Sequence, residues 1–142
     1  MILNINKDRN LECRLETSKS FYKTFKQWAT DKGLNVLPIE LMPWDFFVVS
    51  KNNKDILCTS LFVADHMAIL WHTMGDKKYN RDIFDLSFMF KSIEKYCKKL
   101  NIAFIMGTAG KKGYKKLLEK TGWHDVGVRK EDWYLKIIEQ DG

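Results

Sequence analysis

Residues 67–106 read MAILWHTMGDKKYNRDIFDLSFMFKSIEKYCKKLNIAFIM, and this stretch decides the predicted fold. Its beginning, MAILWHTM, is mostly apolar and indicates a strand. From Asp82 to Leu100 the apolar residues recur at helical spacing, and Asn80 or Asp82 would cap the start of this helix. Its end, IAFIM, suits a short buried strand. Because a helix connects the two strands, we expect them to be parallel, with a right-handed crossover.

Two further strand-like runs precede this stretch, and short turns separate all three. Residues 45–50 (DFFVVS) and residues 56–64 (ILCTSLFVA) are rich in β-branched and aromatic side chains. The dipeptide Asn52-Asn53 between them can adopt the left-handed conformation of a hairpin turn, and Asp65-His66 forms a second turn. Since short turns join antiparallel strands, we expect a three-stranded meander.

The two ends of the chain complete the predicted order. Residues 11–17 (LECRLET) alternate as a half-buried strand does, and a helix capped by Ser18 follows as far as Gly33. Residues 112–121 predict a short helix, and residues 123–138 a closing hairpin. The expected order is β-α-turn-β-β-β-α-β-α-β-β. This is an α/β (α+β) fold, with a mixed, mostly antiparallel sheet of six to seven strands, one central parallel pair and three to four flanking helices.

The composition fits one globular domain over residues 1–142. Lys and Arg number 24 against 18 Asp and Glu, so the formal net charge is +6, which favours polyanionic partners without naming one. No apolar run approaches the roughly 18 residues of a membrane span. The chain turns polar directly after Met-Ile-Leu, unlike a signal peptide. We therefore expect a soluble, cytoplasmic protein with no membrane partner.

Cysteine and histidine are sparse and scattered. Cys13, Cys58 and Cys97 contain no CxxC pair, which argues against a disulfide framework or a zinc ribbon and fits a reducing compartment. Cys58 and Cys97 stand within apolar patterns and are expected to be inert core residues. The three histidines have no nearby carboxylate pattern, so no metal site is expected.

The order of elements resembles that of the GNAT superfamily of N-acetyltransferases, from about Leu11 to Ile138. The most specific local element is GYKKLLEKTGW at residues 113–123, which looks like the family's C-terminal helix and its Gly-aromatic step into the next strand. The resemblance implies an acyl-CoA-dependent N-acetyltransferase. Acetyl-CoA would be its co-substrate, and a small-molecule or protein amine would accept the acetyl group by direct attack.

Three positions depart from the family's pattern. The pyrophosphate loop of the family carries paired glycines, whereas the matching segment GDKKYNRD (75–82) has one glycine, at its beginning. Many members have a proton-donating Tyr where this chain has Leu118, and Tyr114 lies one helical turn earlier. The nearest residue to an asparagine often found after the fifth strand is Thr108.

These departures give an alternative function. In it the chain is a catalytically degenerate GNAT-fold protein that acts as a binding or structural component, such as a phage accessory or virion part. Compact, glycine-poor members of this kind are similar to small phage-encoded GNAT-like proteins. A protein partner is then expected in place of an acceptor.

The resemblance also indicates where the site would lie. The pantetheine arm would enter between the fourth and fifth strands, and a backbone N–H at a bulge in the fourth strand would polarise the thioester carbonyl. His72 is the candidate general base, and its alternative role is that of a strand residue that faces solvent or is hydrogen-bonded in the core. Tyr114 is the candidate general acid, and its alternative role is that of a helix residue that packs on the sheet. Lys77, Lys78 and Arg81 would replace the missing glycines by charge. The expected cofactor contacts are Trp71, Thr73, Met74, Lys77, Lys78, Asn80, Arg81, Gly107, Thr108 and Lys112.

The lysines around the short helix at residues 112–121 give a third hypothesis, a nucleic-acid backbone footprint. A solvated helix face explains most of them, and the resemblance offers a contact with the phosphorylated adenosine of coenzyme A as another interpretation. The chain has no recognised nucleic-acid motif. Nucleic acid therefore ranks last among the partners. The lysines concerned are Lys111, Lys112, Lys115, Lys116 and Lys120.

Overall fold

The computed structural model describes residues 1–36, 38–41, 45–79, 83–108, 116, 118–125 and 133–138. Within these ranges one sheet has the strand order β1-β2-β3-β4-β5-β6-β8-β7. The strands are β1 (Ile2–Asn6), β2 (Leu11–Glu16), β3 (Asp45–Lys51), β4 (Lys54–Ala64), β5 (Met67–Gly75), β6 (Phe104–Thr108), β7 (His124–Asp125) and β8 (Trp133–Ile137). The helices are α1 (Ser18–Asp31), the 3-10 turn η1 (Ile39–Leu41) and α2 (Ile83–Lys99).

Strand directions confirm the predicted fold class. Adjacent strands are antiparallel except β5 and β6, which are parallel and joined through α2. The expected number of strands was too low, because the sheet has eight. The extra strand is β1 at the sheet edge, whose sequence ILNIN contains two asparagines, a residue type depleted in strands.

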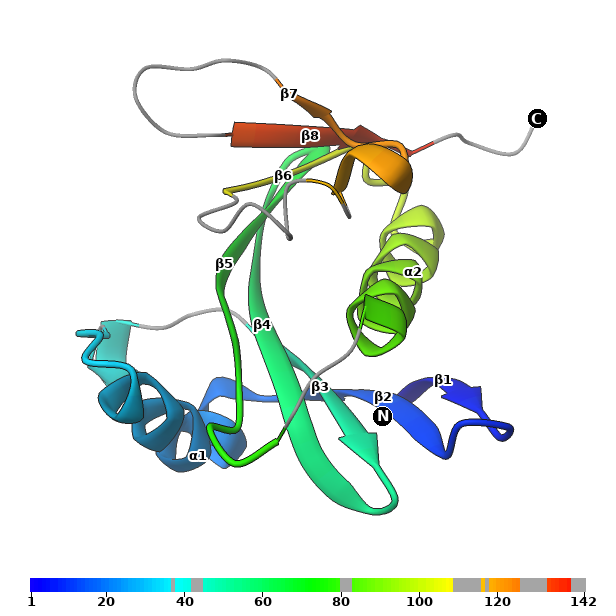
Figure 1. Cartoon of the computed structure of the whole chain (residues 1–142). Coiled ribbons are helices and arrows are strands. Elements are labelled where there is room, and N and C mark those ends of the chain that lie inside the picture. The colour runs from blue at the N-terminus through cyan, green and yellow to red at the C-terminus, as the bar shows by residue number, and fades with distance from the viewer. Residues whose placement is uncertain are drawn as a thin grey trace.

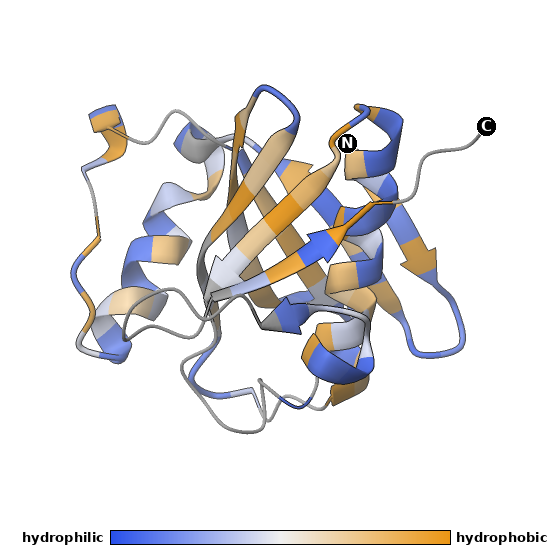
Figure 2. Ribbon diagram, turned by 90° about the horizontal axis from the view of Figure 1, so that it is seen from above, coloured by the Kyte–Doolittle hydropathy of each residue, from blue (hydrophilic) through white to orange (hydrophobic). Residues whose placement is uncertain are grey.

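The two long helices lie on opposite sides of the sheet (Figure 1). Phe46 and Val48 of β3 pack with Phe25 of α1, whereas the alternate residues Phe47 and Val49 belong to the cluster that includes α2. Both faces of β3 are therefore buried. This explains why β3 reads as a continuous apolar run and why hydrophobic residues concentrate on the strands between the helices (Figure 2).

Local signals at the turns are mostly confirmed. Asn52 and Asn53 have φ values of 52° and 64°, the left-handed conformation expected for their hairpin. Gly122, with φ 90°, follows the helical residues 118–120. The helix cap expected at Ser18 was wrong by one residue: the Thr17 side chain accepts from the backbone N–H of Ser20. The proposed caps of α2, Asn80 and Asp82, lie outside the described residues.

The three cysteines are buried in the core, as predicted for Cys58 and Cys97. Burial raises the pKa of the Cys13 and Cys97 thiols to about 12 and also raises the pKa of Cys58. These thiols stay protonated at neutral pH, so they behave as small apolar side chains. In the described part of the chain, no helix is long and apolar enough to span a membrane.

Candidate active site

Strands β5 and β6 pair over only a short part of their lengths. Their register runs from Met67↔Phe104 to Ile69↔Met106 and stops there. Beyond that point β5 continues along β4 to Gly75, while β6 continues along β8 to Thr108. We call the opening between the two diverging strands the β5–β6 wedge. Among the described strands none pairs with the wedge edge of β5, so an extended ligand can pair with its backbone there.

A bulge in β5 lies beside this wedge. Ser60 of β4 pairs with Trp71, and Cys58 pairs with Met74. Two residues of β5, His72 and Thr73, therefore lie opposite the single residue Thr59. A bulge leaves its extra residue outside the regular ladder and re-aims the local backbone, which is why bulges are frequent next to active sites.

A hydrogen bond between two threonine hydroxyl groups holds the bulge in place. The Oγ1 atoms of Thr59 and Thr73 lie 2.9 Å apart and form a hydrogen bond. Thr59 is fully buried, and Thr73 is half-buried. Because a buried hydroxyl left without its partner costs about 1–3 kcal/mol, this pair favours one conformation of the bulge.

The loop after β5 uses its own amides internally. The backbone N–H of Asp76 donates to the carbonyl oxygen of Ile56 at 3.0 Å. The N–H of Lys78 donates to Oδ1 of Asp76 at 3.0 Å, and that of Tyr79 donates to the Asp76 carbonyl at 3.1 Å. These three donors are therefore satisfied within the protein, and a phosphate beside this turn would meet the exposed side chains of Lys77 and Lys78 instead.

A buried carboxylate ties this loop to the rest of the fold. Asp85, in the first turn of α2, is fully buried and accepts from the Tyr79 hydroxyl at 2.7 Å. Nζ of Lys51, at the end of β3, lies 3.5 Å from the other carboxylate oxygen of Asp85. Desolvation is the largest cause that raises the pKa of Tyr79, so its hydroxyl remains a donor at neutral pH. The network fixes the start of α2 against both the loop and the meander.

Comparisons with known proteins then place this architecture. No protein family matches the sequence, and no curated protein matches it either. Solved structures do match. An acetyltransferase of the GNAT family from Staphylococcus aureus Mu50 is 13% identical, with a TM-score of 0.67, over 89% of this chain and 99% of that one. The chain has the GNAT fold.

Two further structures with this fold have named activities. The ribosomal-protein-S18-alanine N-acetyltransferase from Escherichia coli is 14% identical, with a TM-score of 0.69 over 92% of this chain and 96% of that one. N-acetylglutamate synthase from Neisseria gonorrhoeae, complexed with coenzyme A and L-arginine, is 9% identical with a TM-score of 0.70. That match covers 96% of this chain and 35% of the synthase. Identities this low establish the shared fold alone.

The GNAT fold brings several predicted residues to one place. Trp71, His72 and Thr73 lie on β5 at the bulge, and Gly107 lies on β6 across the wedge. A Cβ added to Gly107 would lie 3.6 Å from Cβ of Leu70, an ordinary contact, so this glycine is not required for space. The side chains of Trp71, His72 and Thr108 are outside the described part of the structure.

Other predicted residues are placed differently or lie outside the description. Met74 is 1% exposed and packs in the cluster beneath α1, so only its backbone can contact a ligand in the wedge. Leu118, at the position of the family's acid, is also a core residue. Four predicted residues lie outside the described ranges: Asn80, Arg81, Lys112 and Tyr114. Within those ranges no cluster of His, Cys, Asp and Glu could hold a metal ion.

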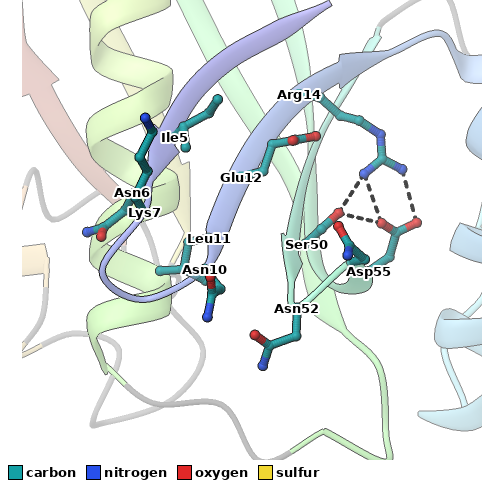
Figure 3. A pocket seen from close by; sticks show the side chains of 11 residues that line it. Ile5, Asn6, Lys7, Asn10, Leu11, Glu12, Arg14, Ser50, Asn52 and Asp55 are labelled. Atoms are coloured by element: carbon teal, nitrogen blue, oxygen red, sulfur yellow. Dashed lines mark hydrogen bonds and ion pairs between the residues drawn. The ribbon is translucent and has the colours of Figure 1, made fainter.

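Sequence reasoning did not find a polar pocket on the other side of β4, between the tips of the β1–β2 and β3–β4 hairpins (Figure 3). Arg14 donates from its Nη atoms to both oxygens of Asp55, at 2.8 and 3.0 Å, and to Ser50 at 2.7 Å. Its Nε donates to Glu16 at 2.7 Å. With these donors engaged, Arg14 acts as a structural link between β2, β3 and β4.

Replacing Arg14 by Met should lower the free energy of unfolding by about 1–3 kcal/mol at pH 7, because half-buried acceptors lose charged donors. Burial alone would raise the pKa of Asp55, but the hydrogen bonds from Arg14 and Ser50 outweigh it, and the pKa is lowered. Because the pKa of Asp55 is lower in the folded protein than its ordinary value of about 4, this carboxylate stabilises the fold at pH values above about 4. The stabilisation is lost as the pH falls through the folded-state pKa.

Urea denaturation of both proteins at pH 7 and pH 3 checks this prediction. The difference between them should shrink at pH 3. Arg9→Met is the matched control, since the exposed Arg9 stacks on the exposed Phe84 and should contribute less than about 1 kcal/mol. Equal losses in the two variants would show that the Arg14 network contributes nothing beyond an ordinary surface charge.

Proposed function

We propose that this chain is an acyl-CoA-dependent N-acetyltransferase that moves an acetyl group from acetyl-CoA to an amine by direct attack. The observation that supports it most is the β5–β6 wedge, with a bulge at residues 72–73 on its edge. A strand edge open to an extended ligand, next to a displaced backbone donor, suits a pantetheine thioester. The coenzyme A bound to a structural neighbour of the same fold also supports acetyl-CoA as the co-substrate.

In the proposed reaction the amine nitrogen attacks the thioester carbonyl carbon. A C–N bond forms, the C–S bond breaks, and coenzyme A leaves as a thiolate. The attacking amine must be neutral, and an ordinary lysine-like amine has a pKa near 10.4, so a base that accepts its proton accelerates the reaction. His72, in the bulge, is the proposed base, and Tyr114 is the proposed acid that protonates the thiolate.

Phosphate binding is assigned to side chains. Lys77 and Lys78 are exposed on the turn that follows β5, and Asp85 holds that turn against α2. Arg81 and Lys112 are proposed to assist them. The proposed location is the cytoplasm, since the chain keeps three buried, free cysteines, which a reducing compartment preserves.

Thermal unfolding with and without coenzyme A and acetyl-CoA tests the proposal. Ligand at about 100 times its dissociation constant adds about 2.7 kcal/mol of stability, which raises the melting temperature by several degrees. Thiol release with a panel of amines then measures turnover, and His72→Asn should lower kcat without weakening coenzyme A binding. If neither ligand shifts the melting temperature at millimolar concentration and no amine releases thiol, the proposal is wrong.

One observation favours the alternative function, a degenerate GNAT-fold protein that binds or supports another macromolecule. The amides of Lys78 and Tyr79, in the loop that would receive the pyrophosphate, are already bonded to Asp76. If acetyl-CoA binding has been lost, the fold serves a partner, such as another component of a phage particle. Coenzyme A binding without turnover of any amine, or no binding at all, would favour this alternative.

A further inference from the structure

One face of the sheet beyond α1 is made of apolar side chains that are not buried. Met106 of β6 pairs with Ile69 of β5 on one side and with Leu135 of β8 on the other. Phe62 of β4 joins this row through its pair with Ile69, and in the neighbouring row on the same face Phe104 pairs with Ile137. These six residues, which we call the apolar sheet face, are Phe62, Ile69, Phe104, Met106, Leu135 and Ile137.

The exposure of this face differs from that of its reverse side. Phe62, Phe104 and Ile137 are 40%, 41% and 51% exposed, and the other three residues are half-buried. On the reverse side of the same strands, Ala68 and Ile105 are fully buried in the cluster that includes α2. A solvated face of a mostly antiparallel sheet is ordinarily polar, so an apolar one of this kind marks a binding surface.

The apolar sheet face adjoins the β5–β6 wedge. Ile69 and Met106, which belong to the face, form the last pair before the two strands diverge. Helix α2 covers the opposite side of these strands, and α1 covers the same side only further along β5, where Met74 packs beneath it. An acceptor can approach a thioester in the wedge from this side. Such an acceptor then lies against the apolar sheet face.

We propose that the acceptor is an amine with an apolar body, alkyl or aromatic, which packs on the apolar sheet face while its amino group reaches the wedge. This inference rests on the proposed acetyltransferase function. Each buried methylene group of such an acceptor contributes about 0.8 kcal/mol, so a six-carbon body can give a clear preference. An apolar surrounding also disfavours the charged ammonium form and so supplies the neutral nucleophile.

The extent of the face favours a small acceptor over a second copy of the chain. With three residues near half exposure and three less exposed, it offers on the order of a few hundred Å². A stable dimer generally buries about 800 Å² on each partner, with well-packed apolar residues at its centre. The six side chains contain no charged group, so nothing in this set recognises a polyamine or a hydroxylated amine.

The test compares 2-phenylethylamine and hexylamine with ethanolamine and free lysine in the thiol-release assay. The apolar amines should have kcat/KM values at least about 10-fold higher. Phe104→Ser and Ile137→Ser should each raise KM for 2-phenylethylamine several-fold and leave KM for ethanolamine unchanged. Ile2→Ser is the matched control, because Ile2 is 56% exposed on β1, away from this face, and should change neither value.

The possible failures are distinguishable. If coenzyme A does not bind and no amine is acetylated, the proposed function falls and this inference falls with it. If ethanolamine or lysine is acetylated as well as the apolar amines, or if the serine variants behave like Ile2→Ser, only the acceptor inference is overturned. Sedimentation analysis tests the remaining alternative. If the protein is a dimer and Phe104→Ser dissociates it, the apolar sheet face binds a second copy of the chain and the acceptor inference is overturned.

Discussion

Reversing the charges of Lys77 and Lys78 together, to Glu, should weaken coenzyme A binding by about 30- to 100-fold. Both side chains are exposed on the turn after β5, and the amides of Asp76, Lys78 and Tyr79 in this turn are bonded within the protein. A unit charge 4 Å from a phosphate contributes about 1 kcal/mol in water, and reversal changes its sign. Because salt screens these exposed charges, the two reversals together should lower the binding free energy by about 2–3 kcal/mol. Since 1.4 kcal/mol corresponds to a tenfold change in affinity, this gives the expected range.

Isothermal titration at two salt concentrations measures this effect. The wild-type affinity should fall as salt rises, because mobile ammonium groups in water hold the phosphates. The control is Lys23→Glu with Lys26→Glu, which changes the net charge by the same amount on the exposed side of α1. Similar losses in the two double variants would show that only overall charge matters. No loss in either would assign the phosphates to residues other than these two lysines.

The fold could be predicted where neighbouring residues decide the structure. Asn52 and Asn53 tolerate positive φ, so the hairpin between β3 and β4 was readable, and the helical spacing after Gly75 gave α2 and the parallel pair. Strand β1 was missed because its own residues do not decide its structure. Its short, asparagine-containing sequence has little strand preference, and pairing with β2 makes it a strand.

The site could be predicted only in part, because its geometry depends on residues far apart in the chain. Lys51 and Asp85 are 34 positions apart, and Arg14 and Asp55 are 41 positions apart, so no local pattern announces these contacts. An acidic residue in the first turn of α2 was the one available signal for Asp85. The bulge at residues 72–73 contains no glycine, and the point where β5 and β6 diverge depends on register alone.

Replacing Phe25 by Ala should lower the free energy of unfolding by about 3–5 kcal/mol, the range for a fully buried aromatic residue. Phe25 is fully buried, and its ring centroid lies 4.8 Å from that of Phe46 on β3 and 6.2 Å from that of Tyr22. The loss leaves a cavity between α1 and the sheet, which rigid strands cannot fill. For a chain of this size, the melting temperature should fall by roughly 10–15 °C.

Phe84→Ala is the control for this effect, because Phe84 is 55% exposed and its replacement should cost less than about 1 kcal/mol.

The Phe25→Ala substitution should also lower the activity of the candidate site. Met74 lies in the same cluster as Phe25 and directly follows the bulge, so a looser contact beneath α1 should loosen the bulge and lower kcat even below the melting transition. Denaturant unfolding and turnover at 15 °C measure both effects. A loss of stability below 2 kcal/mol would mean that α1 is held by something other than this cluster, whereas a large loss with unchanged kcat would separate the bulge from the packing of α1.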